Sequence, residues 1–78
     1  MSAYVTRSMK RQLLHNRLQE ADRVVDAYET AEKRILSLQD KLGASEQLRR
    51  RLAHCQDQLV VARRDQDLAW AAWELGEQ

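Results

Sequence analysis

Two runs of apolar residues with a seven-residue period constrain the fold of this 78-residue chain more than any other feature. The first run ends at Leu42, the second begins at Leu48, and Gly43 lies between them. A seven-residue repeat is the period of left-handed coiled coils of α-helices. Because proline is absent and there are two glycines in all, we expect long helices with one break.

Each run predicts one amphipathic helix. The first run begins at residue 14 and interleaves two sets of positions, which are Leu14, Ala21, Tyr28, Ile35 and Leu42 in one set and Val24, Ala31 and Leu38 in the other. Leu18 and Val25 widen one flank of this stripe. The second run steps by four and three residues through Leu48, Leu52, Cys55, Leu59, Ala62, Gln66, Ala69 and Trp73.

The segment 43–45 is predicted to reverse the chain. Gly43 stands where the end of a helix favours a left-handed residue, and Lys41 places a cation in the last turn before it. Ser45 can cap the next helix, with Glu46 in its first turn. We therefore predict an all-α antiparallel hairpin, divided into an N-terminal overhang (1–13), a first helix (14–42), a turn (43–45), a second helix (46–75) and a tail (76–78).

The two repeats also predict a register. Facing residues of an antiparallel helix pair have a constant sum of residue numbers, and the two seams match each other at a sum of 90, as for Ile35 with Cys55. This register places Trp73 across from Arg17, on which its ring would stack. It also leaves roughly the first twelve residues without a partner helix in the chain.

Several apolar residues lie off the predicted seam and indicate surfaces for other proteins. Val5, Met9 and Leu13 step by four residues, as one face of a helix does. Val61, Leu68 and Leu75 are the large apolar members of a second stripe on the second helix, and Trp70 is either a packing residue or a binding anchor. The predicted partner-binding residues are Tyr4, Val5, Met9, Leu13, Val61, Leu68, Trp70 and Leu75. Because a two-helix hairpin of this length has a small core, we expect it to dimerise into a four-helix bundle or to dock on a partner.

The charge balance favours neither nucleic acid nor membranes. The chain has 13 basic and 12 acidic residues and a net charge of +1, so no global field attracts polyanions. The densest basic run lies at the predicted tip of the hairpin, and its candidate phosphate contacts are Arg34, Arg49, Arg50 and Arg51. The alternative, which we favour, is a solvated surface with Glu46 and Arg50 paired one turn apart.

The sequence gives no sign of catalysis, of a metal site or of a cofactor site. His54 and Cys55 are adjacent, but neighbours on a helix point about 100° apart, and a metal needs about four converging ligands. Cys55 fits the seam as a small apolar residue. A single cysteine, no apolar run of membrane-spanning length and no signal peptide favour the cytoplasm.

From these observations we expect a non-catalytic protein–protein interaction module that acts through helical packing. A small bacterial or phage regulator, inhibitor or assembly factor fits that description, and the excess of arginine over lysine is typical of GC-rich genomes of that kind. The alternative is a nucleic-acid-binding hairpin dimer that uses the arginine-rich tip.

Overall fold

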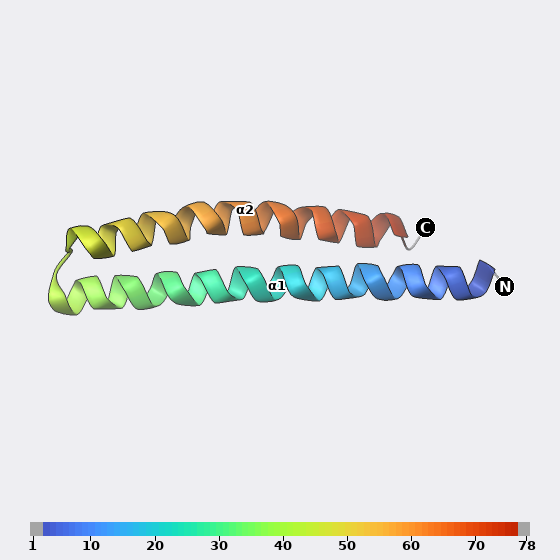
Figure 1. Cartoon of the computed structure of the whole chain (residues 1–78), viewed down its shortest axis with the longest axis horizontal. Helices are drawn as coiled ribbons and strands as arrows, with labels where there is room; N and C mark the ends of the chain where they lie inside the picture. The colour runs from blue at the N-terminus through green and yellow to red at the C-terminus, as the bar shows by residue number, and fades with distance from the viewer. Residues whose placement is uncertain (1–2, 77–78) are drawn as a thin grey trace.

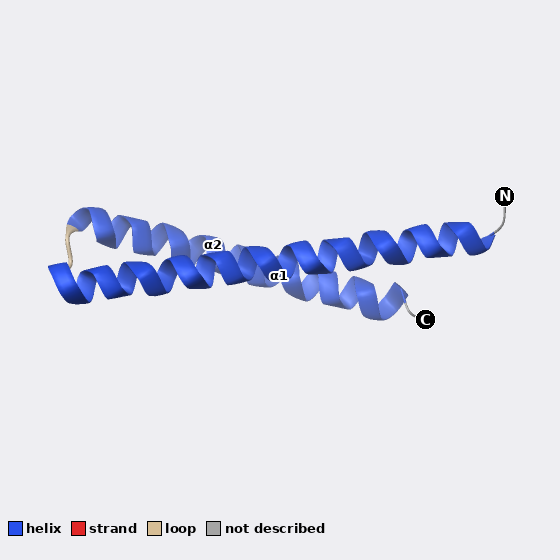
Figure 2. Cartoon of the chain, turned by 90° about the horizontal axis from the view of Figure 1, so that it is seen from below, coloured by secondary structure: helices blue, strands red, loops and turns tan. Residues whose placement is uncertain are grey.

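The computed structural model describes residues 3–76 as two long helices joined by a short turn (Figure 1). Helix α1 spans Ala3–Leu42 and helix α2 spans Glu46–Gly76. The two helices run antiparallel and pack against each other, which confirms the predicted all-α hairpin. They form a thin rod of 61 × 15 × 14 Å, in which one helix crosses the other at a shallow angle (Figure 2).

Helix α1 begins before the start of the first repeat and extends past the end of α2 (Figure 1). Its first turns therefore project beyond the helix pair, as an uninterrupted continuation of α1. The last residue of α2 lies beside Leu14, because a Cβ atom added at Gly76 would collide with the Leu14 side chain. The segment of α1 before about residue 13 has no helix alongside it within residues 3–76.

The turn has the geometry that its residues predict. Gly43 has a φ of +85°, and its N–H donates to the carbonyl oxygen of Gln39 at 2.8 Å, which is the left-handed type of helix C-cap. Ser45 caps α2, because its Oγ accepts from the N–H of Leu48 at 3.1 Å and its carbonyl accepts from the N–H of Arg49 at 3.0 Å. The predicted roles of Gly43 and Ser45 are confirmed.

The core is a narrow line of side chains between the helices. Its buried members are Leu18, Val25, Cys55, Leu59, Ala62 and Ala69. Val25, Leu59 and Ala62 form the central cluster, against which Val24 and Tyr28 pack. In this cluster the small Ala62 of α2 packs with the larger Val25 of α1.

Cys55 is buried and its thiol is free. Its Sγ donates a hydrogen bond to the backbone carbonyl of Tyr28, at 3.2 Å. The register predicted from the sequence places Cys55 opposite Ile35 instead, seven residues further along α1.

The contacts between the helices scatter on both sides of the predicted sum of 90. The residue numbers sum to 90 for Leu14 and Gly76 at the open end, to 88 for Asp22 and Gln66, and to 92 for Glu29 and Arg63. In the middle of the hairpin they sum to 87 for Val25 and Ala62 and to 83 for Tyr28 and Cys55.

The stripes of α1 that are buried differ from the predicted ones, because the apolar surface of this helix is wide. This helix carries three adjacent apolar stripes, and a seam between two helices uses two of them. Leu18 and Val25, which the sequence places on a flank, are buried. The stripe assigned to the seam is only partly covered, since 43% of Leu38 is exposed and its companions Val24 and Ala31 are half-buried.

Candidate protein-interaction surface

One edge of the hairpin is closed by polar contacts between the helices. The Nε2 of Gln66 donates to Oδ1 of Asp22 at 2.8 Å. Further towards the turn, a guanidinium nitrogen of Arg63 lies 3.9 Å from a carboxylate oxygen of Glu29. We call these four residues the polar edge, in which Gln66 and Asp22 are hydrogen-bonded and Arg63 and Glu29 form a looser ion pair.

Trp73 extends the polar edge towards the open end of the hairpin. Its ring centre lies 5.8 Å from that of His15, at an interplanar angle of 52°, and 5.8 Å from the guanidinium carbon of Arg11. The predicted stacking of Trp73 on Arg17 is therefore wrong, because the ring lies against His15 and Arg11 instead. Arg17 lines a groove elsewhere on the hairpin.

The opposite face is apolar and is formed by both helices. On each helix, the residues of this face come directly before seam residues in the sequence. Val61, for example, comes before Ala62, and Val24 comes before Val25. Two right-handed helices that run antiparallel project such residues to the same side of the pair. We call this surface the apolar face, and its apolar residues are Leu13, Val24, Ala31, Leu38, Val61, Leu68, Ala72 and Leu75.

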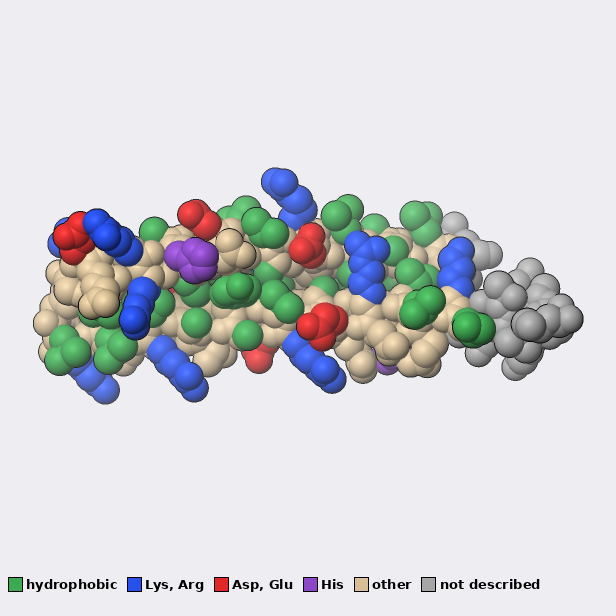
Figure 3. Space-filling model, viewed as in Figure 1, with side chains coloured by type: hydrophobic (Ala, Val, Ile, Leu, Met, Phe, Trp, Pro, Cys, Tyr) green, Lys and Arg blue, Asp and Glu red, His purple; other side chains and the backbone are tan. Residues whose placement is uncertain are grey.

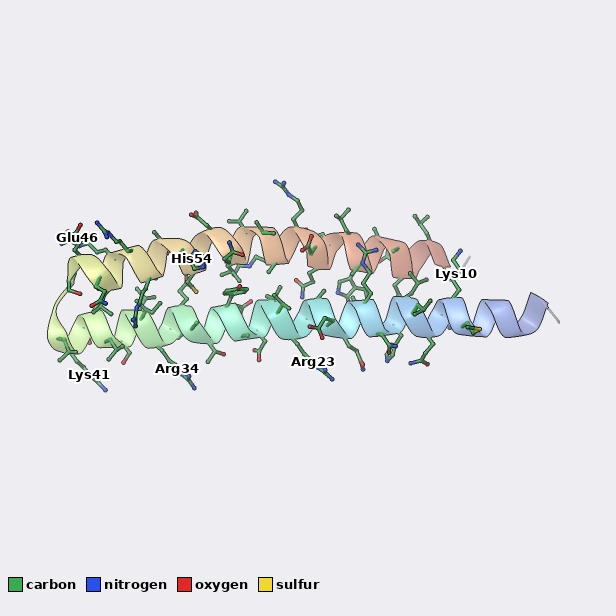
Figure 4. The ribbon with its side chains drawn as sticks, viewed as in Figure 1. Lys10, Arg23, Arg34, Lys41, Glu46 and His54 are labelled. Atoms are coloured by element: carbon green, nitrogen blue, oxygen red, sulfur yellow. The ribbon has the colours of Figure 1, made fainter. Side chains whose placement is uncertain are left out.

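Large side chains of the apolar face are exposed. Val61 is 53% exposed, Leu68 54% and Leu75 69%. His54, which precedes the buried Cys55, belongs to the same face, and Figure 4 shows it on the side of α2 that faces the viewer. Figure 3 gives the same view and shows hydrophobic side chains along both helices on this side.

A groove of about 350 Å³ runs between the helices in the middle of the apolar face. It is lined by Arg17, Glu20, Ala21, Val24, Ala62 and Asp65. Three of these lining residues are charged, and Ala21, Val24 and Ala62 are the apolar ones. Among the described residues, no three histidine, cysteine, aspartate or glutamate side chains gather as metal ligands would.

The structure brings some of the predicted partner-binding residues together and separates others. Trp70 is 45% exposed, but it follows Ala69 and therefore lies on the side of the polar edge. Met9 is exposed on the projecting part of α1. The side chains of Tyr4 and Val5 lie outside the described residues. The predicted residues that share the apolar face are Leu13, Val61, Leu68 and Leu75.

The sequence did not assign Leu38, Val24 or Ala31 to this surface. They were placed in the seam because they complete a three-four spacing with their neighbours. The signal that identifies them is the presence of a third stripe, Leu18 and Val25, on the other flank of α1. A helix with three apolar stripes and one helical partner leaves one stripe for another molecule.

The arginines at the tip do not form one patch. Arg49, Arg50 and Arg51 are consecutive, so they spread over about 200° around α2. The Nη2 of Arg50 bonds to Oε1 of Glu46 at 2.8 Å, which confirms the predicted pair one turn apart. Arg34 projects from the edge of α1 that faces away from α2 (Figure 4).

Comparison with protein-family models, curated proteins and solved structures found no match to this chain. Neither α1 nor α2, within the part that the structure describes, contains a stretch long and apolar enough to cross a bilayer.

Proposed function

We propose that this chain is a non-catalytic protein–protein interaction module that binds another polypeptide by packing helices onto its apolar face. The observation that carries the proposal is the exposure of Val61, Leu68 and Leu75 beside Leu13 and Leu38 of the other helix. Large contiguous apolar patches on soluble monomers mark interaction sites. In this proposal the chain is a small cytoplasmic regulator, inhibitor or assembly factor of a bacterium or phage.

The contrast between the two sides of the hairpin supports this proposal. The polar edge joins the helices through Asp22 with Gln66 and Glu29 with Arg63. The apolar face instead exposes leucine and valine side chains over the same length. Leu36 and Trp70 are exposed large apolar residues on the side of the polar edge, at 46% and 45%. A helix pair with interhelical polar contacts on one side and an apolar stripe from both helices on the other is typical of half of a larger helical bundle.

The alternative function is that of a nucleic-acid-binding hairpin dimer that uses the arginine-rich tip. Arg50 is paired with Glu46, and its neighbours Arg49 and Arg51 point in other directions. The net charge of +1 adds no long-range attraction to phosphates. We therefore expect weak binding to nucleic acid that falls steeply with salt.

A pair of neighbouring valines tests the proposed function. Val61 is 53% exposed on the apolar face, and Val60 is 60% exposed on the outer side of α2. Val61→Glu should remove the bound polypeptide, because it buries a charge at the interface, whereas Val60→Glu is the matched control and should retain it. The polypeptide is detected by sedimentation of the purified chain and by co-purification from the source cells, with circular dichroism to confirm the fold.

The proposal would be refuted by two results together. The chain would sediment as a monomer, and no polypeptide that co-purifies with it would be lost in Val61→Glu. Tight, salt-resistant binding to one RNA or DNA, lost in Arg49→Ala with Arg51→Ala, would establish the alternative instead.

A further inference from the structure

We infer that the occupant of the apolar face is a second copy of this chain, placed so that the turn of each copy lies beside the open end of the other. The result is an antiparallel four-helix bundle. This inference rests on the proposed function, because it names the polypeptide that the apolar face binds. It is carried by the size of the face, by the distribution of its large side chains and by the distribution of its charges.

The apolar face has the area that a stable dimer needs. The helices overlap from about residue 14 to residue 42 of α1, which is about 45 Å of helix at about 1.5 Å per residue. Two helices packed about 10 Å apart give a width of about 20 Å. The resulting area of about 900 Å² per copy matches the roughly 800 Å² per partner of standard stable interfaces.

The leucines at the two ends of the apolar face complement each other in an antiparallel arrangement. Leu68 and Leu75 lie towards the open end, together with Leu13 of α1. Leu38 lies near the turn, where it is 43% exposed. A two-fold axis across the middle of the hairpin places Leu38 of each copy over the leucines at the open end of the other copy.

The half of the face near the turn carries only positive charge. Arg34, Lys41 and Arg51 border this half, and no acidic residue accompanies them on the described part of this face. Figure 4 shows Arg34 and Lys41 projecting from the outer edge of α1, where they would form the rim of an interface.

The half near the open end carries both of the acidic residues of the apolar face. Glu20 and Asp65 line the central groove. Arg17 lines the same groove, and Lys10 lies further out along α1. This half is therefore balanced in charge, and its acidic groups lie nearest to the middle of the rod.

These charges distinguish the two possible orientations of a symmetric pair. A parallel pair, with both turns at the same end, sets the three cations of one copy against the same three cations of the other. An antiparallel pair sets them against the charge-balanced half, in which Glu20 and Asp65 accompany Arg17 and Lys10. Like charges that face each other across an interface are unfavourable, so the antiparallel arrangement, which avoids this repulsion, is the favoured one.

Two sets of variants test this inference, and the first concerns the mass in solution. The purified chain should sediment at twice its mass of 9.1 kDa. Leu38→Glu on the apolar face should reduce the mass to that of one chain, whereas Leu36→Glu should leave the dimer intact. The control is closely matched, because the two leucines are 43% and 46% exposed but Leu36 lies on the side of the polar edge.

The second set tests the orientation on a Cys55→Ala background. One chain carries Leu38→Cys, and a second chain, which bears a different affinity tag, carries Leu68→Cys. The two are mixed and treated with a short bismaleimide, which crosslinks neighbouring thiols. The contacts of Gln66 with Asp22 and of Gly76 with Leu14 place Leu68 level with about residue 21 of α1, about 25 Å from Leu38 at about 1.5 Å per residue. In the antiparallel bundle, position 38 of one copy lies near position 68 of the other. The crosslinked product that joins a Leu38→Cys chain to a Leu68→Cys chain should therefore exceed the products that join two Leu38→Cys chains or two Leu68→Cys chains, which we call the same-site products. A Leu36→Cys chain mixed with a Trp70→Cys chain should give none.

The outcomes separate this inference from the proposed function. A dimer in which the same-site products dominate overturns the orientation. A chain that is a monomer when pure and that binds a different polypeptide through Leu38 overturns the second copy as occupant, while the proposed function stands. A monomer that binds no polypeptide overturns both.

Discussion

Replacement of Gly43 by alanine tests the hairpin directly, because the sign of its effect depends on the fold. Gly43 has a φ of +85°, and a Cβ added there meets no atom within 4 Å. The cost of Gly43→Ala is therefore a backbone cost and contains no steric contribution from neighbouring side chains.

The size of the effect follows from that geometry. A left-handed conformation costs a residue with a Cβ about 1–2 kcal/mol. Alanine also reduces the conformational entropy of the unfolded chain, which returns about 0.4–1 kcal/mol. We expect a net loss of about 1 kcal/mol in the free energy of unfolding, which corresponds to a fall in Tm of about 4–8 °C for a domain of this size.

The assay is urea unfolding followed by circular dichroism, with all variants at one chain concentration because association would add to the measured stability. Gly43→Asn is the control, since asparagine visits the left-handed region more readily than alanine. It should lose less stability than Gly43→Ala, and the slope of free energy against urea should be the same for both.

A gain in stability would refute the reasoning. In a continuous helix through residues 43–45, glycine is about 1 kcal/mol less favourable than alanine. Gly43→Ala would then stabilise the chain by about that amount, and Gly43→Asn would have no special advantage. The chain would be one long coiled-coil helix, and both the turn and the apolar face formed by two helices would be wrong.

Three further predictions follow from the cap and the core. Ser45→Ala should cost about 1 kcal/mol in urea unfolding, because the N–H of Leu48 loses its acceptor; no loss would mean that this cap is not formed. Leu59→Ala should cost about 2–5 kcal/mol, whereas Val60→Ala should change stability by less than about 0.5 kcal/mol, since one side chain is buried and the other exposed; equal losses would contradict the assigned seam. The thiol of Cys55 should react with a maleimide slowly in native buffer and rapidly in urea, as followed by mass spectrometry, because it is buried and donates to a backbone carbonyl; fast native labelling would show that the seam opens at that point.

The helices and the turn could be predicted from the sequence because their causes are local. Two heptad patterns predict two helices wherever the chain places them. A glycine at 43 and a serine at 45 favour the end of one helix and the start of the next through hydrogen bonds to residues three or four positions away. The exposed stripe of Val61 and Leu68 could be predicted for the same reason, since it follows from the periodicity of α2 alone.

The choice of buried stripes on α1 and the extent of the apolar face were decided by the tertiary structure. α1 has apolar side chains on three adjacent stripes, and its own sequence is compatible with the burial of either pair. The packing against α2 selects between them, because Ala62 leaves room for the larger Val25 in the central cluster. That choice turns Leu38 towards solvent and joins it with the stripe of α2 in one face.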